Sequence, residues 1–242
     1  MDNWSTSYDR VLAQRNAEGW MFLIEAARDL RTTGAIAPSS TALARLLTDP
    51  VQEYGMQPLN ILEAGAGTGS VTRTLIPRLS PGSRLDIVEA NTRFAAQLRH
   101  LVRTHPELAG ASERVRVHHT LVEQLDTDRS YDVIVSGLPF TNFTPAQVDT
   151  IMSRYVELLH PGGTLTYFAY RGTRYARALV SSRAESRRHR AVEEVLADYQ
   201  RRYATGCWTA WSNLPPADVW QLRRPADASV PAAPDILAGA AR

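Results

Sequence analysis

The sequence predicts an α/β domain in which a mostly parallel β-sheet is covered by helices on both faces. Three observations lead to this fold class. Between residues 60 and 170, short apolar segments alternate with amphipathic helical segments, as in parallel sheets with crossover helices. A glycine-rich turn joins the first apolar segment to the first helical one. The chain has 242 residues, of which 44% are apolar, and this length and composition suit one globular domain.

The predicted elements follow in a regular order from residue 60. Strands are expected at residues 60–64, 84–90, 114–119, 131–140 and 163–170, with helices between them at 71–79, 92–105 and 146–159. The alternation ends at residue 170, after which 181–204 form one long helical segment and two further strands follow at 208–213 and 217–224. Before the first strand, residues 1–35 have helical apolar spacing, and Ser39 and Ser40 are candidate N-caps of another short helix.

Four segments describe the expected organisation of the chain. We expect an N-terminal helical cap over residues 1–50 and a central domain over 51–225. The central domain includes a helical insertion at about 171–204, and the Ala- and Pro-rich residues 226–242 form a flexible tail.

Composition excludes several classes of protein. The net charge of +2 is too small to indicate a nucleic-acid partner. A single cysteine, Cys207, predicts neither an intramolecular disulfide nor a zinc site, and we expect no metal site. No apolar run is long enough to cross a membrane, and the first twenty residues lack the order of a secretory signal. The expected location is the cytoplasm, with peripheral contact at the inner membrane surface left open.

The glycine-rich turn carries the strongest functional signal. Gly65, Gly67 and Gly69 follow a strand and open a helix, so the turn brings free backbone N–H groups close to a ligand. The dinucleotide fingerprint is G-x-G-x-x-G, whereas this loop is G-x-G-x-G preceded by Glu63. A carboxylate there would repel a diphosphate and suits an ammonium or sulfonium ligand. Glu89 ends the next strand about twenty residues on, where a carboxylate accepts hydrogen bonds from ribose hydroxyls.

This arrangement resembles motif I and the strand-two acid of class I S-adenosylmethionine-dependent methyltransferases. The resemblance implies a Rossmann-like, seven-stranded, mostly parallel sheet with an antiparallel C-terminal strand, an N-terminal helical lid, and S-adenosyl-L-methionine as cofactor. It implies that Glu63 orients the methionine amino group and Glu89 holds the ribose. The family's adenine-binding Asp is missing after strand three, so backbone groups of Leu121 and Val122 are expected there instead. The implied cofactor-binding residues are Glu63, Gly65, Ala66, Gly67, Thr68, Gly69, Glu89, Ala90, Leu121, Val122, Ser136, Gly137 and Ser40.

Three further segments are similar to bacterial phospholipid N-methyltransferases. They are TGAIAPSSTALARLL, VSGLPFTNF and WSNLPPADVWQLRR. The resemblance implies transfer of a methyl group to a lipid-headgroup amine, with peripheral membrane contact. Segment 171–204 departs from the family. It is either a basic amphipathic helix on anionic lipid or a packed lid over the pocket, and the arginines concerned are Arg187, Arg188, Arg190, Arg201 and Arg202.

Ligands of doubly wound sheets bind at the carboxyl ends of the strands, which selects residues 136–140 and 166–170. Ser-Gly-Leu-Pro-Phe resembles the polar-x-Pro-aromatic motif of amino-methyltransferases. Aromatic faces there stabilise a cationic sulfonium or ammonium group, although core packing would also explain each ring. Asn142 either fixes the acceptor or caps the following helix. The catalytic candidates are Phe140, Asn142, Tyr167 and Tyr170.

The leading hypothesis is therefore an amine methyltransferase of the phospholipid type. One alternative is a methyltransferase for a small metabolite. Another is a cyclase that converts S-adenosylmethionine to azetidine-2-carboxylate with release of methylthioadenosine. A binding protein with a decayed site and a nucleic-acid methyltransferase fit less well, because the loop and its two acids are intact and no basic domain is present.

Overall fold

The structure is a computed structural model that describes residues 38–108, 112–171, 183–213 and 216–226. The helix expected over residues 1–35, and all of the expected tail except residue 226, lie outside the described residues. No helix in the described part combines the length and apolar content needed to cross a bilayer.

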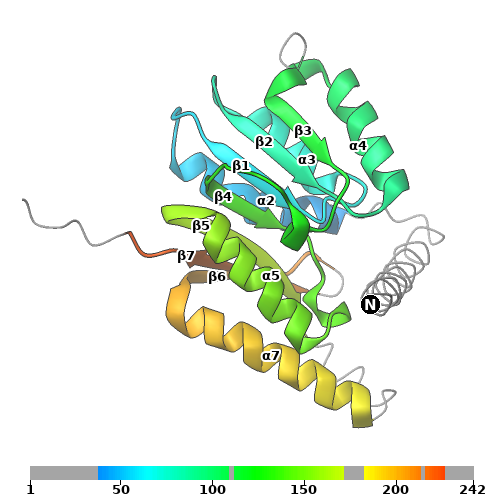
Figure 1. Ribbon diagram of the computed structural model, residues 1–242, viewed down its shortest axis with the longest axis vertical. Helices are drawn as coiled ribbons and strands as arrows, with labels where there is room; N and C mark the ends of the chain where they lie inside the picture. The colour runs from blue at the N-terminus through cyan, green and yellow to red at the C-terminus, as the bar shows by residue number, and fades with distance from the viewer. Residues whose placement is uncertain (1–37, 109–111, 172–182, 214–215, 227–242) are drawn as a thin grey trace, which may run out of the picture.

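Seven strands form one sheet in the order β3-β2-β1-β4-β5-β7-β6 (Figure 1). Strand β7 runs antiparallel to both of its neighbours, and the pairs among β1 to β5 are parallel. The sheet predicted from the sequence, mostly parallel with an antiparallel C-terminal strand, is confirmed. The strands are β1 (Asn60–Ala64), β2 (Arg84–Val88), β3 (Val115–His118), β4 (Tyr131–Ser136), β5 (Leu159–Tyr170), β6 (Ala204–Ala210) and β7 (Ala217–Arg223).

Helices cover both faces of the sheet, as predicted. Helices α2, α3 and α4 contribute to the core on one face, and α5 and α7 contribute to the core on the other (Figure 1). The α-helices are α2 (Pro38–Glu53), α3 (Ser70–Leu75), α4 (Thr92–Thr104), α5 (Pro145–Leu158) and α7 (Arg183–Tyr203). Short 3-10 helices include η1 (Ile76–Arg78), η4 (Val122–Gln124) and η5 (Phe140–Asn142).

Side-chain caps fix where α4 and α5 begin. The Asn91 carboxamide oxygen accepts hydrogen bonds from two backbone N–H groups in the first turn of α4. Thr144 and Gln147 form a reciprocal capping box on α5. The cap of α5 is therefore Thr144, and the capping role considered for Asn142 is wrong.

Several strand boundaries differ from the sequence prediction, including the start of β5, which lies at Leu159 and not at residue 163. Strand β4 ends at Ser136 because Pro139 lacks an N–H group and the chain turns into η5. Strand β6 begins at Ala204, directly after α7, and ends before Trp211, whereas the apolar pattern predicted residues 208–213. Pairing with β7 extends the strand back through Gly206 to Ala204, with a register shift between these two residues. Glycine and alanine are depleted in strands, so the sequence gives little signal at these positions.

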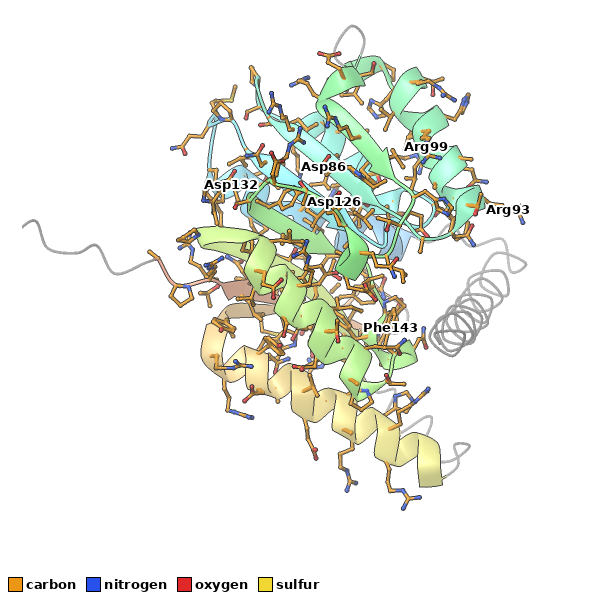
Figure 2. The ribbon with its side chains drawn as sticks, viewed as in Figure 1. Asp86, Arg93, Arg99, Asp126, Asp132 and Phe143 are labelled. Atoms are coloured by element: carbon orange, nitrogen blue, oxygen red, sulfur yellow. The ribbon has the colours of Figure 1, made fainter. Side chains whose placement is uncertain are left out.

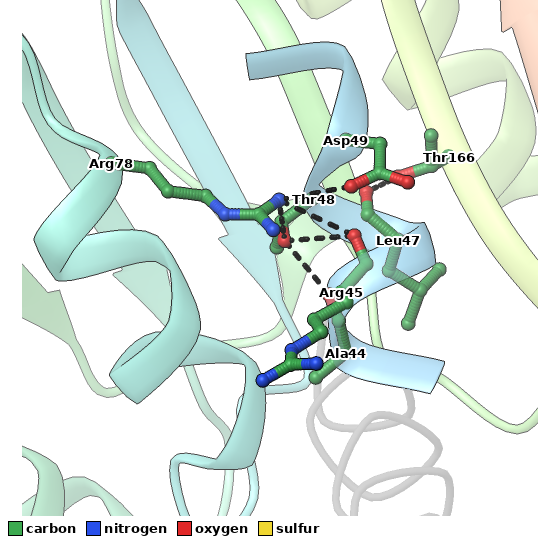
Figure 3. Close-up of polar contacts among 7 residues, drawn as sticks. All are labelled: Ala44, Arg45, Leu47, Thr48, Asp49, Arg78 and Thr166. Carbon is green, nitrogen blue, oxygen red and sulfur yellow. Dashed lines mark hydrogen bonds and ion pairs between the residues drawn. The ribbon is translucent and has the colours of Figure 1, made fainter. Parts of the chain in front are cut away.

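Helix α2 is anchored to the sheet and to η1. The Thr166 hydroxyl on β5 donates to the Leu47 carbonyl at 2.6 Å, and Arg78 donates to the Thr48 hydroxyl at 2.6 Å and pairs with Asp49 at 3.2 Å (Figure 3). Leu47 is fully buried in the core. The boundary expected between residues 50 and 51 falls inside this helix.

Helix α7 places its apolar face in the core. Val192, Leu196 and Tyr199 are buried, and the Tyr199 hydroxyl lies 2.9 Å from an Asp149 carboxylate oxygen and 2.7 Å from the Ser153 hydroxyl on α5. This apolar face is consequently unavailable for insertion into lipid. The arginines of α7 whose side chains are described and exposed are Arg187, Arg188, Arg190, Arg201 and Arg202.

Candidate cofactor and acceptor site

The loop between β1 and α3 has three left-handed glycines. Gly65, Gly67 and Gly69 have φ values of 70°, 55° and 82°, which residues with a Cβ adopt at a cost. A Cβ on Gly65 would lie 2.3 Å from a Leu138 methyl carbon, whereas a Cβ on Gly67 would meet no atom within 4 Å. Gly65 is therefore required by packing against the loop after β4, and Gly67 faces open space that a ligand can fill.

Glu63 is completely buried at the base of this loop. The Thr72 hydroxyl on α3 donates to Glu63 Oε2 at 2.7 Å, and Glu63 Oε1 has no hydrogen-bond partner. Burial raises the pKa of Glu63 from 4.5 to about 7, despite the hydrogen bonds from Thr72. A buried carboxylate oxygen without a donor is costly, so this arrangement favours a cationic N–H donor from a ligand.

Glu89 connects the glycine loop to α4. Its carboxylate accepts hydrogen bonds from the backbone N–H of Gly67 at 2.8 Å and of Asn91 at 2.7 Å. The side chain is buried, and desolvation raises the pKa of Glu89 in spite of these donors. Each carboxylate oxygen accepts more than one hydrogen bond, so ribose hydroxyls can be added to this arrangement.

A mainly apolar hollow of about 280 Å³ lies beside this carboxylate. Leu121 and Val122, which the resemblance assigns to the adenine, and Ala90, another expected cofactor-binding residue, line it. Its other lining residues are Gly65, Val88, Thr120, Glu123, Leu138, Phe143 and Ile151. Its apolar walls and its position next to Glu89 fit an adenine ring.

The loop after β4 packs directly on the glycine loop. The Gly137 N–H donates to the Ala64 carbonyl at 2.8 Å, and a Cβ on Gly137 would lie 2.7 Å from the Gly65 carbonyl oxygen. Ser136 is fully buried, and its hydroxyl accepts a hydrogen bond from Tyr155 at 3.0 Å. The side chain of Ser136, a predicted cofactor residue, is thus engaged in the core, while Gly137 lies against the loop.

Phe140 and Tyr167 form one aromatic contact behind this loop. Both are buried, their centroids are 5.5 Å apart, and their planes are nearly perpendicular. Phe143, labelled in Figure 2, contributes a third ring. Its centroid lies 6.4 Å from that of Phe140. The Gln200 side-chain amide on α7 donates to the Tyr167 hydroxyl at 2.7 Å. Helix α7 therefore holds the ring that supports Phe140.

The four catalytic candidates do not form one cluster. Tyr170 is half-buried and packs on Phe168 at 5.1 Å on the opposite face of the sheet from Tyr167. Asn142 is exposed at the end of η5. Tyr167 and Phe140 are together, whereas Tyr170 and Asn142 lie apart from that pair.

The remaining predicted cofactor residues are less informative. Ala66 is buried and Thr68 is half-buried in the glycine loop. Ser40 lies in the first turn of α2, which begins at Pro38, and its side chain is outside the description. The N-cap role considered for Ser39 and Ser40 is therefore wrong.

Sequence analysis missed three residues that hold the site together. Thr72 donates to Glu63, Asn91 donates its N–H to Glu89, and Gln200 donates to Tyr167. Asn91 had a detectable signal, because an Asn directly before a helical segment is a preferred N-cap. Within the described ranges, no group of three His, Cys, Asp or Glu residues is arranged to hold a metal ion.

Comparison with known proteins agrees with this geometry. Residues 61–163 match the family described as a methyltransferase domain. A stretch of 131 residues is 29% identical to the ornithine lipid N-methyltransferase of Singulisphaera acidiphila and covers 54% of this chain and 66% of that protein. A stretch of equal length is 28% identical to a polyketide synthase–nonribosomal peptide synthetase of Pyricularia oryzae, of which it covers 3%. The chain thus spans less than two thirds of the length of either relative.

Solved structures share the fold. The 1,6-didemethyltoxoflavin N1-methyltransferase of Burkholderia thailandensis, which was crystallised with S-adenosylhomocysteine, is 16% identical and has a TM-score of 0.60 over 88% of this chain and 90% of that one. The sheet order and this structural likeness show the Rossmann-like fold expected from the sequence, and the family match covers residues 61–163, which are less than half of the chain. Residues 61–163 are thus similar to a methyltransferase domain, and S-adenosylhomocysteine is bound in the Burkholderia structure.

Proposed function

We propose that this protein transfers the methyl group of S-adenosylmethionine to the amine nitrogen of a lipid head group. The observation that carries the proposal is the close packing of the β4 loop on the glycine loop. Gly137 lies against the Gly65 backbone, and the loop leads directly to Phe140. An acceptor held along this loop would lie next to the cofactor. The similarity to the ornithine lipid N-methyltransferase supports an amine on a lipid.

The residues fit the cofactor at three points. In the proposed mode, Glu63 Oε1 accepts from the methionine ammonium group, Glu89 accepts from the ribose hydroxyls, and the hollow lined by Leu121 and Val122 takes the adenine. When bound, the cofactor supplies an electrophilic methyl group on a sulfonium. The open space at Gly67 allows this ligand to approach the backbone.

The protein's own contribution to transfer is alignment and the exclusion of water. In-line displacement needs the acceptor nitrogen about 3 Å from the methyl carbon. Leu138 and Phe140 are buried and provide an apolar wall beside the reacting atoms. The amine must be neutral when its lone pair attacks, and its surplus proton leaves to solvent after transfer. A dedicated general base is not required for this reaction.

A small metabolite is a second candidate acceptor. The apolar face of α7 is in the core, which weakens the interpretation of that face as a lipid-inserting element. The Burkholderia enzyme with a TM-score of 0.60 was crystallised with 1,6-didemethyltoxoflavin. This alternative keeps the cofactor site and changes only the acceptor.

Mass spectrometry of the protein with S-adenosylmethionine would test the proposal. The samples would contain no acceptor, vesicles with phosphatidylethanolamine, or vesicles with an ornithine lipid. S-adenosylhomocysteine that forms only with an amino-lipid, together with a methylated lipid, is the expected result. Methylthioadenosine without acceptor would instead mean that the cofactor is the substrate. Cofactor binding without turnover on any lipid would contradict the lipid proposal.

A further inference from the structure

Two exposed tryptophans lie on the outermost strand of the sheet, β6, and in the turn that follows it. Three large apolar side chains are exposed in the described part of the chain, namely Met56, Trp208 and Trp211. Trp208 on β6 is 47% exposed, and Trp211, in the turn that follows, is 71% exposed. Strand β6 is the last strand of the sheet, so both indole rings are carried by an edge strand and its turn.

The end of β6 lies at the carboxyl ends of the parallel strands, where the candidate site also lies. Ala210 pairs with Ala217, and Ala217 pairs with Tyr170 at the end of β5. Because β1, β4 and β5 are parallel, the end of β5 lies at the edge where the glycine loop and the β4 loop also begin. Trp211 therefore lies on the rim from which an acceptor would enter.

A cation accompanies the outermost ring. The Arg171 guanidinium lies over the Trp211 ring at 5.3 Å from its centroid. The same guanidinium donates to the Thr209 hydroxyl at 3.2 Å and pairs with Asp218 at 3.4 Å. These contacts hold the arginine beside Trp211. Tryptophan and arginine together match the interface of a bilayer, where aromatic rings lie at the depth of charged head groups.

More positive charge lies at this edge of the sheet. Helix α7 ends where β6 begins at Ala204 and contacts η5. Its first turns lie toward the carboxyl ends of the parallel strands, where the candidate site also lies (Figure 1). Exposed arginines in these turns are Arg187, Arg188 and Arg190. Glu193 and Glu194 follow about one turn later. The N-terminal end of α7 is thus basic and complements an anionic surface.

We propose that Trp208, Trp211 and Arg171, named here the tryptophan corner, dock the protein on an anionic phospholipid bilayer. The first arginines of α7 face the head groups in this orientation. The proposal rests on the proposed function, because docking through this edge presents the candidate site to a lipid amine. A bilayer fits better than a protein partner because its interface provides both an apolar region for the indole rings and negatively charged head groups for the arginines.

Vesicle sedimentation of the whole chain would test the corner. The probes are phosphatidylcholine vesicles with and without phosphatidylglycerol. We expect binding that depends on the anionic lipid, weakened about tenfold by Trp208→Ala with Trp211→Ala and about fivefold by Arg171→Ala. Met56→Ala and Arg84→Ala are matched controls, since both residues are exposed and lie at the amino ends of the parallel strands, opposite the candidate site. Neither control should change binding by more than about twofold.

Two further readouts separate this proposal from the proposed function. The tryptophan variants should retain S-adenosylhomocysteine affinity and the methylation of a water-soluble, short-chain amino-lipid, while methylation in vesicles falls with binding. Lipid methylation without vesicle binding, or equal losses in the controls, would overturn the docking surface and leave the methyltransferase intact. A change in sedimentation coefficient caused by Trp211→Ala, with unchanged vesicle binding, would show that the corner pairs with a second copy of the chain.

Discussion

Thr72 donates its hydroxyl hydrogen to one oxygen of Glu63 at 2.7 Å, and the other oxygen of that carboxylate has no partner. The pair joins the end of β1 to α3 beneath the glycine loop. One half of the carboxylate is thus satisfied by the fold, and the other half is left for a ligand. This division makes the charge of Glu63 the variable that connects pH, stability and cofactor binding.

We expect affinity for S-adenosylhomocysteine to rise about tenfold between pH 6 and pH 8. The pKa of Glu63 is about 7, so the carboxylate that would attract the ligand's ammonium group is mostly protonated at pH 6 and mostly ionised at pH 8. Isothermal titration calorimetry would measure the affinity. Glu63→Gln should bind more weakly and with little pH dependence. A wild-type affinity that is equal at both pH values would contradict the assignment of Glu63.

The same residue predicts how the stability of the free protein changes with pH. Its folded-state pKa is raised from 4.5 to about 7, so its stabilising contribution is complete below pH 4.5 and is lost as the pH rises through 7. The loss is about 3 kcal/mol at most. Urea unfolding should therefore show Glu63→Gln to be more stable than the wild type at pH 8, with no such advantage at pH 4.5. The opposite order would indicate that the charge is compensated within the protein.

Gly67→Ala should abolish cofactor binding while the protein remains folded. Gly67 has φ 55° and open space where a Cβ would lie, so we expect about 1 kcal/mol of backbone strain together with a methyl group in the ligand's space. Gly162→Ala is the matched control, because Gly162 has φ 81°, the same open surroundings and a position at the start of β5. Thermal unfolding with and without S-adenosylhomocysteine should show equal destabilisation of the two variants and ligand stabilisation only in Gly162→Ala.

The sequence predicts the sheet and the glycine-rich turn well because their signals are local. Alternating strand and helix patterns and a glycine spacing within five residues need no knowledge of distant contacts. The sequence also predicts that Tyr167 and Tyr170 lie on opposite faces of β5, because they are three residues apart and alternate strand positions point to opposite sides. The contacts of Thr72 and Gln200 could not be predicted from the sequence, because each joins elements that only the folded chain brings together.

Tyr167→Phe should keep most of the proposed methyltransferase activity, whereas Tyr167→Ala should lose it. The ring is fully buried against Phe140, so its removal leaves a cavity that costs about 3–5 kcal/mol. Loss of the hydroxyl costs about 1 kcal/mol, because only the bond from Gln200 disappears. A double-mutant cycle of Tyr167→Phe with Gln200→Ala should give a coupling of about 1 kcal/mol. If Tyr167→Phe abolished turnover without changing stability, the hydroxyl itself would take part in the reaction.

Asp86→Asn should destabilise the fold at pH 7 by about 3 kcal/mol. Asp86 on β2, labelled in Figure 2, is buried. It accepts hydrogen bonds from Arg129 and Tyr131, each at 2.9 Å, and lies 2.9 Å from His118 Nε2. Burial alone would raise the pKa of Asp86, but the hydrogen bonds from His118 and Tyr131 and the charge of Arg129 hold that pKa below 3.8. The amide cannot satisfy all three donors.

The pH dependence of this effect has a defined sign. Because the folded-state pKa of Asp86 is lowered, its contribution is complete above pH 3.8 and is lost as the pH falls through the folded-state pKa. Urea unfolding should therefore show the wild type converging with Asp86→Asn as the pH is lowered below 3.8. Asp126→Asn is the control, since Asp126 is exposed and its replacement should change stability by less than about 0.5 kcal/mol. Equal losses in both variants would show that buried Asp86 contributes no more to stability than an exposed carboxylate does.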